Sequence, residues 1–223
     1  MIEDLYLRQP TPEYRQAFDL AVSQLNRADG PVLAVLSSAA HAVDLLKRCP
    51  RPLDLAGTGT FAAADFVSSA NGWVWGAVRA VTLAEGAPGY AAILWAEPED
   101  PQARSIATLM RRLVAGGAVL VVITSGPLRG HLPAWQFRPF PVEKPLSPGR
   151  VTLMLRAAGW QVEHHIIFHG PRAIVWSYLA RAAHNLNRPD WADRCTFAAR
   201  EYYREAGWTW PLAPLALIRA RAM

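Results

Sequence analysis

Three histidines in the second half of the chain are the residues whose type and spacing first suggest chemistry. His164, His165 and His169 fall in a stretch that we predict to be a strand, where His165 and His169 share one face and His164 points the other way. A zinc site needs ligands that converge with an acid or a cysteine, and neither HExxH nor CxxC spacing occurs. We therefore predict solvated strand histidines and no metal site.

A proline-rich segment, residues 125–148, carries the next candidates, and we call it the lid. It holds six prolines and few periodic apolar residues, which is typical of a functional loop. His131 has the residue type of a general base, although a lone loop histidine is more often an ordinary surface residue. Trp135, together with Trp176 and Trp191, could line an apolar cavity or a partner surface. The sequence therefore predicts a substrate lid with His131 and Trp135, and no catalytic residue.

A short glycine turn, Gly57-Thr58-Gly59, is the third candidate. Its simplest interpretation is a strand-to-helix turn in which Thr58 or Thr60 caps the helix. The alternative is a ligand-binding turn in the crevice of a doubly wound sheet, with Asp54 directed to the same ligand. Neither a G-x-S-x-G elbow nor a Walker loop occurs, so hydrolase and nucleotidase functions have no support.

The elements that must position these residues alternate along the chain. Short apolar stretches are separated by segments of helical periodicity, such as the apolar face formed by Ile106, Met110 and Leu113. This alternation predicts a parallel, doubly wound α/β sheet in one domain, residues 1–223. A mostly helical insertion, residues 171–206, precedes the last strand. The predicted strands are residues 31–36, 51–55, 73–80, 90–95, 118–124, 161–168 and 212–221.

Composition and charge limit the class of protein. The 223 residues are 52% hydrophobic and 18% charged, which supplies a large core and excludes a disordered chain. No apolar stretch is long enough to span a membrane. The acidic N-terminus lacks the bases of a signal peptide, and two cysteines, Cys49 and Cys195, fit a reduced cytosol. We therefore expect a cytoplasmic protein.

The net charge of +5 is unevenly distributed. Residues 1–124 contain 10 bases and 12 acids, whereas residues 125–223 contain 13 bases and 6 acids. A basic second half could face nucleic acid, an anionic membrane or an acidic protein. No run of bases occurs, so dispersed, solvated arginines are the simpler interpretation, and nucleic acid is an unlikely partner.

Four segments, taken in order, resemble one known family. Residues 76–94, the helix-turn-strand of residues 109–122 with Gly116-Gly117 at its turn, residues 145–162 and residues 211–221 together span much of the chain. Their order and spacing are similar to class I S-adenosylmethionine-dependent methyltransferases, in particular the type 11-like branch that acts on small molecules. The resemblance implies a Rossmann-like methyltransferase fold, with a seven-stranded, mostly parallel sheet, one antiparallel strand and helices on both faces.

The cofactor loop of that family follows its first strand, and chain length decides which segment this is. Two crossover units must separate the first strand from the fourth, and each needs about 30 residues. The 37 positions from Asp54 to Ala91 are too few, whereas the 57 from Ala34 to Ala91 fit. The first strand is therefore residues 32–36, and the cofactor loop is residues 37–41.

In this register the residues that the family uses for its cofactor are missing. The loop of residues 37–41 has no glycine, although a close approach of backbone to ligand favours glycine. The resemblance places the family's acids at the first strand, at the end of the second (the ribose contact), after the third (the adenine contact) and at the start of the fourth. These positions fall on Ala34, Ala56, Ala77 and Ala91.

Two main functions follow from this interpretation. In the first, the chain has a degraded cofactor site and binds no cofactor. It then serves as a non-catalytic partner or accessory subunit, and either associates with another protein or forms a homo-oligomer. In the second, it is an active methyltransferase that acts on a small, fairly apolar acceptor beneath the lid. S-adenosylmethionine would then contact the backbone near Ser37, Ser38, Gly57, Thr58 and Ala77. A nucleic-acid-binding module is a third, less favoured function.

Overall fold

The computed structural model describes residues 12–70, 77–84, 89–99, 101–126, 146–168, 170–202, 204–206 and 215–223. Most of the lid, including His131 and Trp135, lies outside these residues, as do His169 and residues 71–76 of the third predicted strand. Within the described residues, none of the helices combines the length and the apolar character that crossing a membrane requires.

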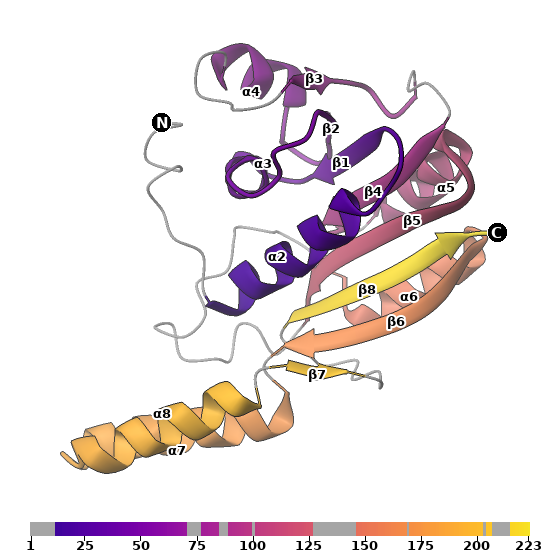
Figure 1. Cartoon of the computed structure of the whole chain (residues 1–223). Helices are drawn as coiled ribbons and strands as arrows, with labels where there is room; N and C mark the ends of the chain where they lie inside the picture. The colour runs from indigo at the N-terminus through magenta and orange to yellow at the C-terminus, as the bar shows by residue number, and fades with distance from the viewer. Residues whose placement is uncertain are drawn as a thin grey trace.

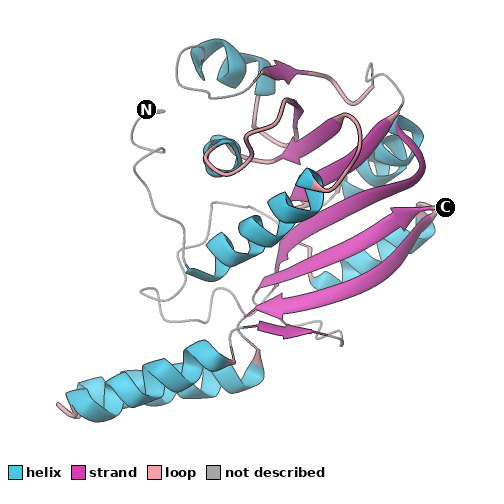
Figure 2. Cartoon of the chain, viewed as in Figure 1, coloured by secondary structure: helices cyan, strands magenta, loops and turns pink. Residues whose placement is uncertain are grey.

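One sheet runs through the described part of the chain, with strand order β3-β2-β1-β4-β5-β8-β6-β7 (Figures 1 and 2). Strands β1 to β5 pair in parallel, whereas β8 runs antiparallel to both β5 and β6. This arrangement confirms the predicted mostly parallel sheet, and β7 adds a short edge strand paired with β6. The strands are β1 (Val32–Leu36), β2 (Leu53–Gly57), β3 (Val78–Ala80), β4 (Tyr90–Ala96), β5 (Val114–Ser125), β6 (Trp160–Phe168), β7 (Arg204–Ala206) and β8 (Leu215–Ala222).

Helices cover both faces of the sheet, as predicted, and two hydrophobic cores result (Figure 1). Because β1 is buried on both faces, Ala34 and Leu36 pack on one side and Leu33 and Val35 on the other, which explains its uninterrupted apolar sequence. Helices α2 (Pro12–Asn26), α3 (Ala39–Leu46) and α4 (Ala63–Ala70) contribute to the first core, and α5 (Ala103–Leu113) and α6 (Pro148–Ala157) to the second.

Two further helices, α7 (Pro171–Asn185) and α8 (Pro189–Glu201), form an antiparallel hairpin beyond the β7 edge of the sheet (Figure 1). They occupy most of the predicted insertion. Trp176 packs beside buried Ala173 and Ala199 inside the hairpin, whereas the side chain of Trp191 is about half exposed. The two tryptophans therefore do not share one environment.

The second strand begins and ends two residues later than predicted. Pro52 has no N–H to donate, so the first ladder bond of β2 is donated by Leu53 to the carbonyl of Ala77. At the other end, Gly57 pairs with Leu36 of β1 and extends the strand. Gly57 is therefore the last residue of β2 and not the first residue of a loop.

Candidate functional site

The carboxyl ends of β2, β1 and β4 lie side by side at one edge of the sheet. The chain passes from β1 outward to β2 and β3, and then returns to the other side of β1 as β4. In open parallel sheets, ligands bind outside the strand ends at such a switch point. The loops after β1, β2 and β4 are therefore the ones that decide whether this edge can hold a ligand.

The loop after β1 is short and is tied to the helix that follows it. Ser38 is the N-cap of α3, and its hydroxyl accepts a hydrogen bond from the backbone N–H of His41 at 3.3 Å. Ser37 is buried, and its hydroxyl lies 3.4 Å from Nδ1 of His41. The His41 ring is itself fully buried and stacks on Phe18. Ser37 and Ser38 thus lie where the sequence predicts, but each already bonds to this loop or helix.

The end of β2 leaves no room for a side chain. A Cβ built on Gly57 would lie 1.9 Å from the carbonyl oxygen of Phe61, because the loop curls back onto the strand end. Thr58 donates to the carbonyl of Leu36 from both its backbone N–H, at 2.9 Å, and its hydroxyl, at 3.2 Å. One interpretation of the sequence predicted that Thr58 or Thr60 caps the following helix. The side chain of Thr58 bonds instead to the end of β1 and does not cap α4. Ala56 is only 1% exposed and lies in the core.

The predicted position of Ala77 after the third strand is wrong. Strand β3 begins at Val78, which pairs with Leu53 at the start of β2, so Ala77 precedes the strand. The residue that follows β3 is Val81, whose N–H donates to the carbonyl of Leu55. Ala77 therefore lies near the amino ends of the parallel strands. Four other predicted contact residues lie near their carboxyl ends: Ser37, Ser38, Gly57 and Thr58.

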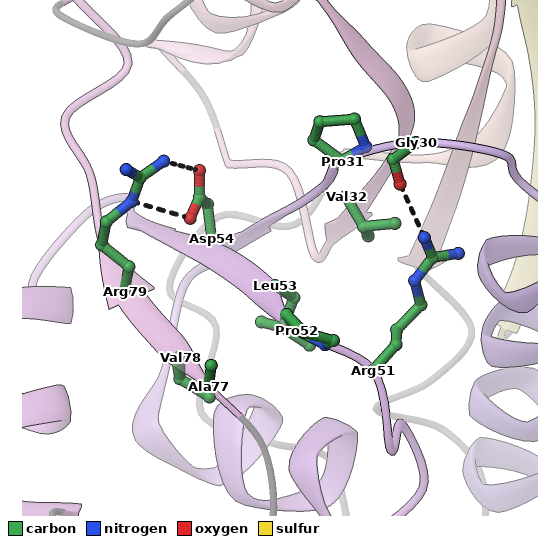
Figure 3. A pocket seen from close by; sticks show the side chains of 10 residues that line it. All are labelled: Gly30, Pro31, Val32, Arg51, Pro52, Leu53, Asp54, Ala77, Val78 and Arg79. Atoms are coloured by element: carbon green, nitrogen blue, oxygen red, sulfur yellow. Dashed lines mark hydrogen bonds and ion pairs between the residues drawn. The ribbon is translucent and has the colours of Figure 1, made fainter.

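Asp54 also lies away from the switch point, which removes the alternative in which it reaches a ligand beside Gly57. It borders a cavity of about 580 Å³ near the amino ends of β1, β2 and β3 (Figure 3). Its carboxylate accepts two hydrogen bonds from Arg79, at 2.7 and 3.0 Å, and one from the Tyr90 hydroxyl at 2.5 Å.

These hydrogen bonds also shift the pKa values of the Asp54 carboxyl and the Tyr90 hydroxyl. Burial alone would raise the pKa of Asp54, but the hydrogen bonds and charge of Arg79 and the Tyr90 bond outweigh it and hold this pKa below its ordinary value. Burial, followed by the bond to Asp54, raises the pKa of Tyr90 to about 12. The group is a structural ion pair that joins β2, β3 and β4.

Two carboxylates after β4 lie at the switch-point edge, and the sequence interpretation did not include them. Glu97 is fully buried, and its backbone has a positive φ of 55°, which is uncommon for a residue with a Cβ. The N–H of Ser125 donates to Oε2 of Glu97 at 3.0 Å, and the Ser125 hydroxyl donates to Oε1. Glu97 therefore links the end of β4 to the end of β5 through these hydrogen bonds.

Glu99 reaches from the loop after β4 to the loop after β2. A Cβ built on Gly59 would lie 3.2 Å from Oε2 of Glu99, and Gly59 has a positive φ of 62°. Because β1 lies between β2 and β4, the two loops approach each other beside the carboxyl end of β1. The signal for it in the sequence is the Glu-Pro-Glu stretch that directly follows a buried strand. A cavity of about 600 Å³ lies further out, between α4 and the ends of β2 and β3.

The predicted strand histidines have different environments. His164 is exposed, whereas His165 is partly buried, with Nε2 2.8 Å from the hydroxyl of Thr152 on α6. Burial, the charge of Arg156 and the neighbouring His164 lower the pKa of His165. In the described ranges, no three histidine, cysteine or acidic side chains are grouped so that they could hold a metal ion.

Comparison with known proteins identifies the fold. No protein-family profile matches the sequence, and no curated protein matches it either. Solved structures do match: the [4+2]-cyclase SpnF has a TM-score of 0.55 at 14% identity, over 93% of this chain and 81% of that one. The N-methyltransferase NodS from Bradyrhizobium japonicum WM9, in complex with S-adenosyl-L-homocysteine, has a TM-score of 0.54 at 16% identity, over 99% and 96%.

A geranyl diphosphate methyltransferase in complex with SAM gives a TM-score of 0.50 at 12% identity, over 94% of this chain and 85% of that one. Each likeness extends over most of both chains. The chain therefore has the Rossmann-like fold of the class I S-adenosylmethionine-dependent methyltransferases.

Proposed function

We propose that this chain is a methyltransferase-fold protein whose cofactor crevice is degraded, and that it serves as a non-catalytic partner or accessory subunit. The observation that carries the proposal is the approach of Glu99 to Gly59 across the end of β1. This approach supports the proposal, because it brings a carboxylate of the chain itself toward the region where a doubly wound sheet binds its ligand.

The loops on either side support the same conclusion. A carboxylate at the end of β2 would give the ribose hydroxyls a charge-assisted acceptor. The last residue of β2 is instead Gly57, and the Phe61 carbonyl takes the position of any side chain there. After β1, Ser37 and Ser38 carry Cβ atoms and hydroxyls where a glycine would let the backbone approach a ligand.

An active methyltransferase is the alternative, and one observation favours it. Glu99 places a carboxylate beside the end of β1, and a carboxylate there could accept hydrogen bonds from ribose hydroxyls in place of the missing acids. Methyl transfer depends mainly on positioning an activated methyl group, so no catalytic side chain is required. In this alternative the lid, with His131 and Trp135, would cover a small, fairly apolar acceptor. Ala77 has no part in it, because it lies at the opposite edge.

Thermal denaturation with millimolar S-adenosylmethionine or S-adenosylhomocysteine separates the two functions. A ligand at 100 times its dissociation constant stabilises a protein by about 2.7 kcal/mol. For a domain of this size that raises the melting temperature by several degrees, at roughly 2–4 °C per kcal/mol. We expect no resolvable shift for the natural chain.

The variant Glu99→Ala shows whether cofactor binding, where a shift reveals it, depends on this carboxylate. A shift of several degrees that Glu99→Ala abolishes would contradict our proposal and establish the alternative. Asp29→Ala is the matched control, because it removes an exposed acid before β1, at the other edge of the sheet. A shift that both variants retain would also contradict the proposal, and it would place the cofactor away from Glu99.

A further inference from the structure

Helices α5 and α6 carry five arginines and no acid on one side of the sheet. Both helices pack on the second core, on the side of the sheet opposite α2 (Figure 1). They lie side by side, and Arg111 of α5 donates a hydrogen bond at 3.4 Å to the carbonyl of Gly159, just beyond the end of α6. The bases of this α5–α6 surface are Arg104, Arg111, Arg112, Arg150 and Arg156.

Most of these arginines are exposed to solvent. Arg104, Thr108 and Arg112 follow one another at intervals of four residues and are all exposed, so they form a stripe along the outer side of α5. Along this stripe the helix rises by about 12 Å from Arg104 to Arg112. Arg150 and Arg156 of α6 are exposed as well. The surface therefore presents several positive charges to one partner.

The fold assembles this surface from two separate segments. The sequence contains no run of bases, and on that ground alone nucleic acid is an unlikely partner. The last arginine of α5, Arg112, lies 38 positions before the first arginine of α6, Arg150. Because the two helices pack beside each other, bases that are far apart in the sequence share one face of the molecule. A face of one sign attracts partners that carry many charges of the other sign.

A nucleic-acid backbone fits this surface better than other anionic partners do. Leu153 of α6 is the only exposed large apolar residue of the two helices. A protein interface has an apolar core, and a helix that binds a bilayer inserts an apolar face, so both partners need more apolar surface than this. Nucleic acid needs mainly bases. A duplex carries about one charge per 1.7 Å of its axis, so the stripe on α5 is as long as a stretch of about seven phosphates.

We propose that the α5–α6 surface binds the phosphate backbone of a nucleic-acid duplex without reading its base sequence. The arginines neutralise phosphates, and Ser105, exposed beside Arg104, has a hydroxyl of the kind that donates to phosphate oxygens. Contacts to phosphates carry no sequence information, so duplexes of unrelated sequence should bind equally well. The surface lies outside the cofactor crevice, so this proposal does not depend on cofactor binding.

The test is the affinity of the natural chain for a DNA duplex, measured by fluorescence anisotropy over a range of salt concentrations. Each phosphate that the protein neutralises adds about −0.9 to the slope of the logarithm of the binding constant against the logarithm of the salt concentration. With three to five arginines in contact, we expect a slope of about −3 to −4.5 for a duplex of about 20 base pairs. Two duplexes of unrelated sequence should give the same slope and the same affinity.

Paired substitutions test whether the α5–α6 surface is the one that binds. Arg104→Gln with Arg112→Gln should weaken binding by at least about tenfold at low salt and reduce the steepness of the slope by about 2, since two phosphate contacts are lost. Arg181→Gln with Arg194→Gln is the matched control, because it removes the same charge from two exposed arginines of the α7–α8 hairpin. The control should leave the slope unchanged. Circular dichroism of both variants establishes that they are folded.

Four results would overturn the proposal. The first is no binding of the duplex at low salt, and the second is binding that the α5 variant leaves unchanged. The third is equal weakening by the hairpin control, because net charge and not this surface would then cause the binding. The fourth is tighter binding to phosphatidylserine vesicles than to the duplex, lost in the α5 variant, which would assign the surface to a membrane.

Discussion

Gly57 shows how one residue decides the shape of the crevice. Any side chain at this position meets the carbonyl oxygen of Phe61, which is backbone and cannot rotate away. We expect Gly57→Ala to lower the free energy of unfolding by at least about 3 kcal/mol, the upper range for overpacking. Gly116→Ala is the control, since a Cβ there meets nothing within 4 Å. It should change stability by about 0.5 kcal/mol or less.

Urea unfolding of both variants measures this difference. If Gly57→Ala were as stable as Gly116→Ala, the loop after β2 would be able to move away from the strand end. The crevice would then be adaptable, and the space beside Gly57 could admit a ligand.

The site itself was predictable from the sequence only where it depends on local spacing. The loop after β1, with Ser37 and Ser38, lies where chain length and the family resemblance place it. Glu99 and Gly59, which approach each other, are 40 positions apart in the sequence, and only the strand order brings them together. The position of Ala77 failed for the same kind of reason, because the start of β3 is set by its pairing with β2.

At the scale of elements, the alternation of strands and helices was predictable, and the strand ends were less so. Buried strands such as β1 and β4 have uninterrupted apolar sequence because helices cover both faces. Strand β5 starts at Val114, four residues earlier than predicted, because Val114 pairs with Tyr90 before a register shift that leaves extra residues in β5. Pairing between distant segments sets such ends, and periodicity within one segment does not report it.

The contact between α6 and β6 predicts a dependence of stability on pH. Thr152 donates to the carbonyl of Pro148, so its hydroxyl is left to accept a hydrogen bond from His165. Burial, Arg156 and His164 lower the pKa of His165 in the folded state, so the unfolded chain binds the proton more readily. Stability should therefore fall as the pH drops below the unfolded value of about 6.5.

Replacement of His165 tests this expectation. His165→Gln should reduce the stability loss between about pH 7 and pH 5, since glutamine does not titrate and can still donate to Thr152. His164→Gln, which changes the exposed neighbour, should reduce the stability loss less than His165→Gln does. Urea unfolding at several pH values supplies the comparison. Equal pH dependence in the natural chain and in His165→Gln would show that other groups cause it.

At the scale of the whole molecule, the sheet and the hairpin differ in what stabilises them. The centre of the sheet lies between two extensive cores, whereas the buried interior of the hairpin is made of alanine, serine and cysteine. Small side chains bury little apolar area, so the hairpin should open locally at a lower free energy than the sheet. Amide hydrogen exchange should therefore be slowest in β1 and β4 and faster in α7 and α8.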